Sequence, residues 1–255
     1  MKISTIFLYD EPSVPEINIS RLADFLRKIF FVKVELGKNI FSFANNLTAK
    51  EIASCRIYNS KKPFEKHEPT HEEIIFEEQS IVDSSKTKNI VMYDGFEFQK
   101  VITKLIPNNK LSLDQFHVIF TNKLTCTFDQ NDYRYHGRAL IGSNPSIIST
   151  TGIIEAPAKP RGYYFDLISN ITLGLNLDLI KKKYQGTYLE YHDKRLSSII
   201  EGYLLQALFY YFTGEAFCEN RDCRLYNAHW QNDLIHSQLK VGKLCDKHQQ
   251  ILNNL

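Results

Sequence analysis

The sequence predicts an α/β (α+β) protein with a twisted mixed sheet and a helical C-terminal part. Three observations lead to this fold class: a strand–helix–strand order in the first 36 residues, a strand-rich middle, and helical periodicity from Tyr163 onward. The 255 residues, 43% of them hydrophobic, are sufficient to bury a substantial core. We expect one domain over 1–255, with an N-terminal βαβ part at 1–92 and the rest of the sheet and helices at 93–255.

The N-terminal part begins with a buried strand at 2–10, "KISTIFLYD", followed by an amphipathic helix at 18–30. Residues 31–36 alternate in hydrophobicity, which predicts a second strand. A capping box from Thr48 to Glu51 predicts a short helix. Residues 59–85 are polar and charged, so we expect an insertion without regular structure.

A helix follows at 94–106, and the middle of the chain then favours strands. The expected buried side of that helix consists of Phe96, Val101, Ile102 and Leu105. Residues 115–128 fit either one long strand or a hairpin. Two more strands are expected at 138–143 and 146–156, separated by the turn residues Ser143, Asn144 and Pro145.

The strongest helical pattern opens at Asp193, after a loop at 156–162 and a first helical stretch. Apolar residues recur at helical spacing as far as Tyr211, and Gly214 is placed to end the helix as a left-handed cap. The sheet therefore precedes a mainly helical C-terminal part.

The charge pattern disfavours nucleic acid or an anionic membrane as the main partner, because the net charge is only +2 and both signs are interspersed. No apolar run approaches the roughly 20 residues that cross a bilayer. The N-terminus lacks the apolar core of a signal peptide, so we expect a cytoplasmic protein. Five cysteines, an odd number, argue against a disulfide framework in that compartment.

Three of the cysteines fall in the last 38 residues, with spacing typical of a metal site. Cys218 and Cys223 form one pair, and Cys245 and His248 form a second pair after 21 intervening residues. Thiolates and imidazole are the ligands that zinc prefers, and four of them make a closed, tetrahedral structural site. We therefore predict one structural zinc ion on these four residues. His229 and His236 lie between the pairs and are alternative ligands.

A second metal-like motif, "HEPTH" at 67–71, has the HExxH spacing of zinc peptidases. That motif requires a helix that places both histidines on one face. Pro69 in its middle costs about 3 kcal/mol inside a helix. We interpret His67 and His71 as a chance match in a charged segment. Cys55 and Cys126 are interpreted as small core residues.

The C-terminal stretch resembles the archaemetzincin family of zinc metallopeptidases. In that family an HExxHxxGxxH motif runs into a cysteine pair, a Met-turn position and a second pair of cysteines. Gly214 stands at the motif's glycine and Leu225 at the Met-turn position; Cys218, Cys223 and Cys245 match three cysteines, and His248 replaces the fourth. The resemblance implies a metzincin-like fold closed by a structural zinc clip, which we define as Cys218, Cys223, Cys245 and His248.

The resemblance fails at the catalytic residues. Ala207, Tyr211 and Phe217 occupy the positions of the three histidines, and Leu208 occupies the position of the glutamate. A catalytic zinc needs about three protein ligands and an open position, so the matched site is degenerate. Spare candidates for an atypical metal site are His192, Glu201 and Glu215, together with His229 and His236.

The sequence therefore predicts an archaemetzincin-like, catalytically inactive zinc protein that binds a peptide or protein partner. A candidate binding surface lies beside the clip at Glu215, Asn227, Trp230 and Asp233, although Trp230 also fits a purely structural loop anchor. An active metallopeptidase or other hydrolase with atypical ligands is the alternative. A nucleic-acid-binding zinc protein is a third class, which the near-neutral charge disfavours.

Overall fold

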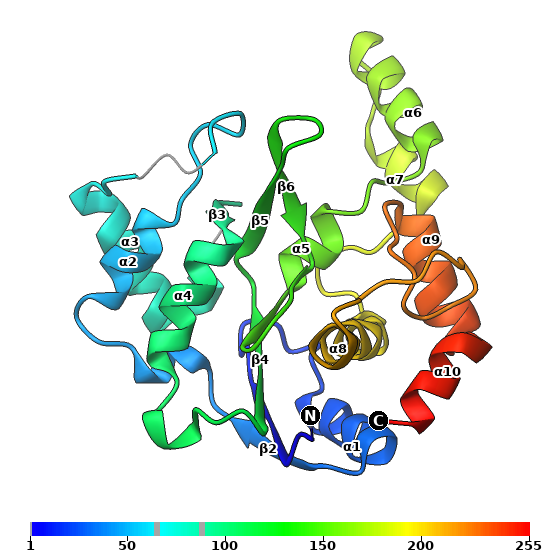
Figure 1. Cartoon of the computed structure of the whole chain (residues 1–255). Helices are drawn as coiled ribbons and strands as arrows, with labels where there is room; N and C mark the ends of the chain where they lie inside the picture. Colours follow the sequence, from blue (N-terminus) through cyan, green and yellow to red (C-terminus); the bar gives the residue numbers. More distant parts are fainter. Residues whose placement is uncertain (1, 64–66, 87–89) are drawn as a thin grey trace.

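The computed structural model describes residues 2–63, 67–86 and 90–255, and is built around a five-stranded sheet (Figure 1). The strand order is β2-β1-β4-β8-β7, in which the first four strands are parallel and β7 is an antiparallel edge. A smaller sheet has the order β3-β5-β6. The strands are β1 (Thr5–Tyr9), β2 (Lys33–Gly37), β3 (Met92–Asp94), β4 (Gln115–Thr121), β5 (Leu124–Asp129), β6 (Arg134–Arg138), β7 (Leu140–Ile141) and β8 (Ser146–Ser149).

Helices cover both faces of the large sheet because its central strands are apolar on both sides. In β1, Ile6 and Leu8 face one core cluster, and Phe7 and Tyr9 face another. The first cluster is formed with α1 (Ile19–Phe30), α5 (Thr150–Glu155) and α8 (Leu196–Thr213). The second is formed mainly with α2 (Thr48–Ser54) and α4 (Gly95–Leu105). This three-layer arrangement is visible in Figure 1, with the sheet between the two groups of helices.

The predicted fold class and the opening βαβ unit are confirmed, since β1 and β2 are parallel neighbours joined by α1. The prediction for 115–128 is wrong in both of its forms: β4 and β5 join different sheets. The expected strand at 146–156 is also too long. Ser149 accepts a hydrogen bond from the Gly152 N–H, so its side chain caps α5 and ends β8.

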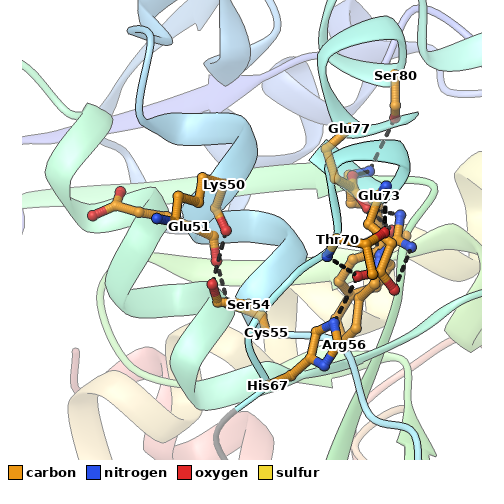
Figure 2. Close-up of polar contacts among 12 residues, drawn as sticks. Lys50, Glu51, Ser54, Cys55, Arg56, His67, Thr70, Glu73, Glu77 and Ser80 are labelled. Atoms are coloured by element: carbon orange, nitrogen blue, oxygen red, sulfur yellow. Dashed lines mark hydrogen bonds and ion pairs between the residues drawn. The ribbon is translucent and has the colours of Figure 1, made fainter. Parts of the chain in front are cut away.

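The prediction of irregular structure over 59–85 is wrong, because α3 occupies His71–Val82; residues 64–66 of that segment lie outside the described residues. Thr70 and Glu73 form a capping box at the start of α3. The sequence conceals this helix because its inward side is polar: Glu77 is fully buried and paired with Arg56 and Lys123. Figure 2 shows the Arg56 side of this network.

One residue of the predicted buried side of α4 is misplaced. Phe96 is 55% exposed, whereas Phe98 is fully buried together with Val101 and Ile102. Phe96 lies in the first turn, where Asp94 caps the helix by accepting hydrogen bonds from the Phe96 and Glu97 N–H groups. The cap fixes the rotation of the helix and turns Phe96 outward.

The C-terminal part is helical, as predicted, and α8 is its most buried helix. Its other helices are α6 (Arg161–Thr172), α7 (Asp178–Tyr184), α9 (Gln231–Ile235), the π-helix η4 (His236–Val241) and α10 (Asp246–Asn253). Gly214 ends α8 in the left-handed conformation, with φ of 80°, as its position predicts. Within the described part of the chain, we find no helix with the length and hydropathy to cross a membrane.

Candidate metal centre

The Cys218–Cys223 pair and the Cys245–His248 pair meet beside the C-terminal half of α8. Cys218 and Cys223 lie on the loop that follows Gly214, and the Cys218 N–H donates to the Leu225 carbonyl at 2.9 Å. Cys245 is the N-cap residue of α10, and His248 lies in the first turn of that helix. A C-x2-H spacing that begins at a helix N-cap brings both ligands to the same end of the helix.

The four side chains of the zinc clip form a compact cluster, in which all ligand atoms lie within 4.8 Å of one another. Cys218 Sγ is 3.9 Å from Cys245 Sγ, Cys223 Sγ is 3.8 Å from His248 Nδ1, and Cys245 Sγ is 3.1 Å from the same Nδ1. Ligands bound to one tetrahedral zinc ion at about 2.0–2.3 Å lie roughly 3.3–3.8 Å apart. Both the chemistry of the donors and their spacing therefore fit zinc.

Backbone groups are arranged to support thiolates in this cluster. The Cys245 N–H donates to Cys223 Sγ, and the Asn220 N–H donates to Cys218 Sγ, both at 3.4 Å. Such N–H···S bonds orient and stabilise metal-bound cysteines. The Phe209 ring packs edge-on against His248 at 5.6 Å and holds the imidazole in place.

The electrostatics of the cluster also suit a cation. Burial raises the pKa of the Cys223 thiol to about 12, so this buried sulfur needs a nearby positive charge to become a thiolate. At Cys245 burial acts in the same direction, but hydrogen bonds, first from the His248 backbone, outweigh it and lower the pKa. Burial and the neighbouring Lys247 charge lower the pKa of His248, which keeps the imidazole in its neutral, metal-binding form.

A buried ion-pair network fastens the cysteine loop to α8. Arg224, between Cys223 and Leu225, donates to Glu201 Oε2 at 2.9 Å and to the Ser198 carbonyl at 2.6 Å. Arg21 of α1 donates to the other oxygen of Glu201 at 3.0 Å. Each carboxylate oxygen of Glu201 therefore accepts a hydrogen bond from an arginine, and the residue has a structural role. Arg224 was not predicted from the sequence, because a single buried arginine leaves no recognisable sequence pattern. The only sequence feature that could have indicated its burial is its position between two residues that are themselves buried.

The alternative ligands lie outside the cluster. The histidine that completes the cluster with the three cysteines is His248, and neither His229 nor His236 belongs to it. His236 Nε2 is instead 2.6 Å from Asp222 Oδ1, and His229 is exposed. Of the other spare candidates, His192 contacts Glu16 at 3.1 Å, and Glu215 is exposed.

The HEPTH motif does not form a metal-binding helix. Pro69 precedes the Thr70 cap, so His67 lies before α3 and His71 is its first residue. His67 Nε2 contacts Glu73 Oε2 at 2.7 Å, as drawn in Figure 2, and its ring packs on Tyr58. Cys55 and Cys126 are buried in the hydrophobic core clusters, in agreement with their interpretation as core residues.

The positions that match the family's catalytic residues are spread over different environments. Ala207 and Leu208 are fully buried in the first core cluster. Tyr211 packs on Phe116, with ring centroids 4.8 Å apart, and its hydroxyl donates to the Leu113 carbonyl. Phe217 is 47% exposed. No imidazole or carboxylate occupies these four positions.

A cleft of about 330 Å³ lies on another side of α8, between edge strand β7 and residues 226–229. The lining of the cleft includes Tyr203, Gln206 and Phe217. It also includes Arg138 and Asn227. Gln206 is 2% exposed, and its Oε1 has no hydrogen-bond partner in the structure. Buried amide oxygens are normally paired, and this one is covered by protein atoms rather than open to the cleft.

The predicted binding surface beside the clip is divided in the structure. Asn227 lines the cleft. Trp230 pairs through its backbone with Ala158 and lies under the Arg161 guanidinium at 5.3 Å. Asp233 accepts a hydrogen bond from Arg221 Nε at 2.8 Å. Trp230 therefore contacts Ala158 and Arg161, while the side chain of Asn227 is exposed.

Fold and cluster together define an α/β protein with a three-cysteine, one-histidine site suited to zinc. The chain belongs to the family described as "Probable metallopeptidase family (DUF6775)", whose model matches residues 2–255. The predicted resemblance to a metallopeptidase family is thereby confirmed. No curated protein matches the chain significantly.

Two solved structures are similar to this chain. A zinc-dependent peptidase from Methanocorpusculum labreanum has 11% identity and a TM-score of 0.44, with 98% of this chain and 100% of that chain covered. Archaemetzincin from Methanopyrus kandleri has 10% identity and a TM-score of 0.47, with 99% and 94% covered.

Proposed function

We propose that this chain is a catalytically inactive member of its family, which holds one structural zinc ion and binds a peptide in the cleft beside α8. The observation that carries the proposal is the side-chain content of α8. Ala207 and Leu208 are packed in the core, and Tyr211 donates its hydroxyl proton to a backbone carbonyl. Three zinc ligands and an open position cannot be assembled from these residues.

The zinc clip supports the structural role of the metal. A site with four protein ligands leaves no position for water or substrate, so the ion would act only on the fold. It would join the loop at 218–225 to α10, two segments that also share a hydrophobic cluster.

The cleft supports the binding role. Its lining includes the exposed Asn227, whose side-chain amide can both donate to and accept from the backbone of a peptide. The cleft borders β7, a strand with one sheet neighbour, and extended peptides can add to such an edge.

Zinc stoichiometry tests the first part of the proposal. Elemental analysis of the purified protein should give one zinc per chain, and the Cys223→Ser variant should give none. Fluorescent casein should remain uncleaved by the zinc-loaded protein. Two zinc ions per chain, or cleavage that survives removal of contaminating proteases, would contradict an inactive, clip-only protein.

Peptide binding tests the second part. A fluorescein-labelled peptide pool from digested casein should raise its anisotropy with wild-type protein, and Asn227→Trp should abolish the rise by filling the cleft rim. Asn131→Trp, an equally exposed change in the β5–β6 turn, serves as the control. Equal binding by both variants would place the peptide elsewhere.

A second candidate function, a metallohydrolase with atypical ligands, rests on another cluster. Asp129, Asp132 and His136 of the β5–β6 hairpin have ligand atoms within 4.8 Å of one another. Arg134 already pairs with Asp132 at 2.7 Å, which weakens its affinity for a cation. A second zinc ion that is lost in His136→Ala, together with an activity, would favour this candidate.

A further inference from the structure

The helix pair α6 and α7 presents an apolar surface that nothing in the described chain covers. Figure 1 shows it projecting from the body of the molecule. We define the α6 patch by five side chains that are 52–76% exposed: Phe165, Ile168, Ile171, Leu173 and Leu175. Three of these residues are spaced three apart along α6 and form one stripe, which continues into the turn before α7.

The side of α6 that faces α7 is mixed in character. Asp166 accepts hydrogen bonds from Lys183 Nζ at 2.6 Å and from the Tyr184 hydroxyl at 2.9 Å, and the Tyr163 ring packs against Tyr184. None of the residues of α6 is buried. A helix in a monomer normally turns its apolar stripe inward, so this stripe lacks a partner.

The patch is held in a defined position by the base of the helix pair. The Tyr163 ring packs against Tyr184 and Tyr188, at centroid distances of 5.7 and 5.4 Å. Arg161 lies over Trp230, and the Ala158 N–H donates to the His229 carbonyl at 2.8 Å. A surface fixed in this way loses little conformational entropy when it binds.

We propose that the occupant of the α6 patch is the same patch of a second copy of this chain, related by a two-fold axis. The area supports a pair: five side chains with on the order of 100 Å² exposed each give about 1,000 Å² over two copies, the lower limit of a specific interface. The stripe contains no charge, so self-pairing opposes no like charges. The axis passes near Ile168, the centre of α6.

Charges at the two ends of the helix pair complement each other in this arrangement. Arg161 begins α6, and Asp178, whose side chain is 72% exposed, begins α7 at the opposite end. Two antiparallel copies of α6 place Arg161 of each copy near the end that carries Asp178 of the other. A two-fold axis produces this contact twice.

Sedimentation equilibrium of the full-length protein from 1 to 100 µM tests the proposal. Wild type should reach the mass of a dimer in this range, and Ile168→Glu should weaken association by at least about 100-fold, because two carboxylates would meet at the axis. Leu113→Glu, at an 81% exposed apolar position outside the patch, should associate like wild type. Circular dichroism shows whether each variant is folded.

A charge exchange tests the antiparallel arrangement. Arg161→Asp and Asp178→Arg should each weaken the dimer by about 3- to 10-fold, and the double variant should restore it. A wild-type protein that is monomeric at 100 µM overturns the proposal. So does an unchanged dimer in Ile168→Glu, or a monomer whose patch binds lipid vesicles instead.

Discussion

The buried Glu77 carboxylate provides a sharp test of how the N-terminal part is held together. Glu77 is fully buried in α3; its Oε1 accepts from Arg56 Nη2 at 2.6 Å and from the Tyr93 hydroxyl at 2.7 Å, and its Oε2 accepts from Lys123 Nζ at 2.7 Å. Lys123 is 1% exposed in its side chain and has no other carboxylate partner in the described structure. Glu77→Gln therefore leaves a buried ammonium group without a counter-charge.

We expect Glu77→Gln to lower the free energy of unfolding by about 3–5 kcal/mol, the usual cost of removing one partner of a buried ion pair. Urea denaturation followed by tryptophan fluorescence and by circular dichroism measures the change. Glu78→Gln is the matched control, because Glu78 is an exposed glutamate on the same helix. Its loss should stay within about 0.5 kcal/mol, as is usual for a surface substitution.

A double variant separates charge from packing. In Glu77→Gln with Lys123→Met, the unpaired ammonium is gone, and the total loss should be smaller than the sum of the single losses by more than about 1 kcal/mol. The reasoning is refuted if Glu77→Gln costs less than about 1 kcal/mol, or if the two changes are additive.

Three further predictions concern the core around the site. Gly202→Ala should destabilise the protein by about 1–3 kcal/mol in urea denaturation, although alanine favours helices. Its Cβ would lie 1.6 Å from Gln238 Oε1, and Gln238 is buried and donates to the Arg224 carbonyl, so displacing it would break that bond; a gain in stability would contradict this. Leu208→Glu introduces the residue type that the archaemetzincin resemblance implies at this position. It should cost at least about 3 kcal/mol and yield no peptidase activity, since Leu208 is fully buried; a stable, active variant would overturn the interpretation of α8. Burial lowers the pKa of His117, so the fold holds it neutral, and stability should fall as the pH drops below about 6.5, the ordinary histidine value. His117→Gln should flatten that part of the pH profile measured by urea denaturation between pH 7.5 and 5, and an unchanged slope would assign the effect to other groups.

The fold can be predicted from the sequence where a local pattern of residues repeats along the chain. The βαβ opening, the long helix ending at Gly214 and the pairing of the four clip residues all follow from periodicity or ligand spacing. The α3 helix does not, because Glu77 is buried by distant partners, Arg56 and Lys123, which no local pattern connects. Likewise, β4 and β5 are separated by two residues yet join different sheets, since long-range pairing decides their neighbours.

The cleft is equally invisible in the sequence. The archaemetzincin resemblance aligns Ala207 and Leu208 with catalytic positions, but the structure lines the cleft with Gln206 of the same helix. Neighbouring helix residues differ by about 100° in direction, so a spacing argument cannot say which one faces the cleft. Three-dimensional packing makes that choice.

The stretch 218–229 carries two residues of the zinc clip and one side of the cleft, so the proposed peptide binding should depend on the metal. Cys218 pairs through its backbone with Tyr226, and residues 226–229 form one wall of the cleft. The Tyr226 carbonyl is also 3.4 Å from Gln206 Nε2, the amide at the cleft wall. Loss of zinc would free Cys218 and Cys245 from each other, whereas Arg224 would still hold the loop to Glu201. We therefore expect a chelator to weaken peptide binding by at least about 10-fold while most of the helical circular dichroism remains, since metal binding is coupled to local order. If the zinc-free protein is folded and its peptide affinity is unchanged, metal binding and peptide binding are independent, and the zinc clip has no influence on the cleft.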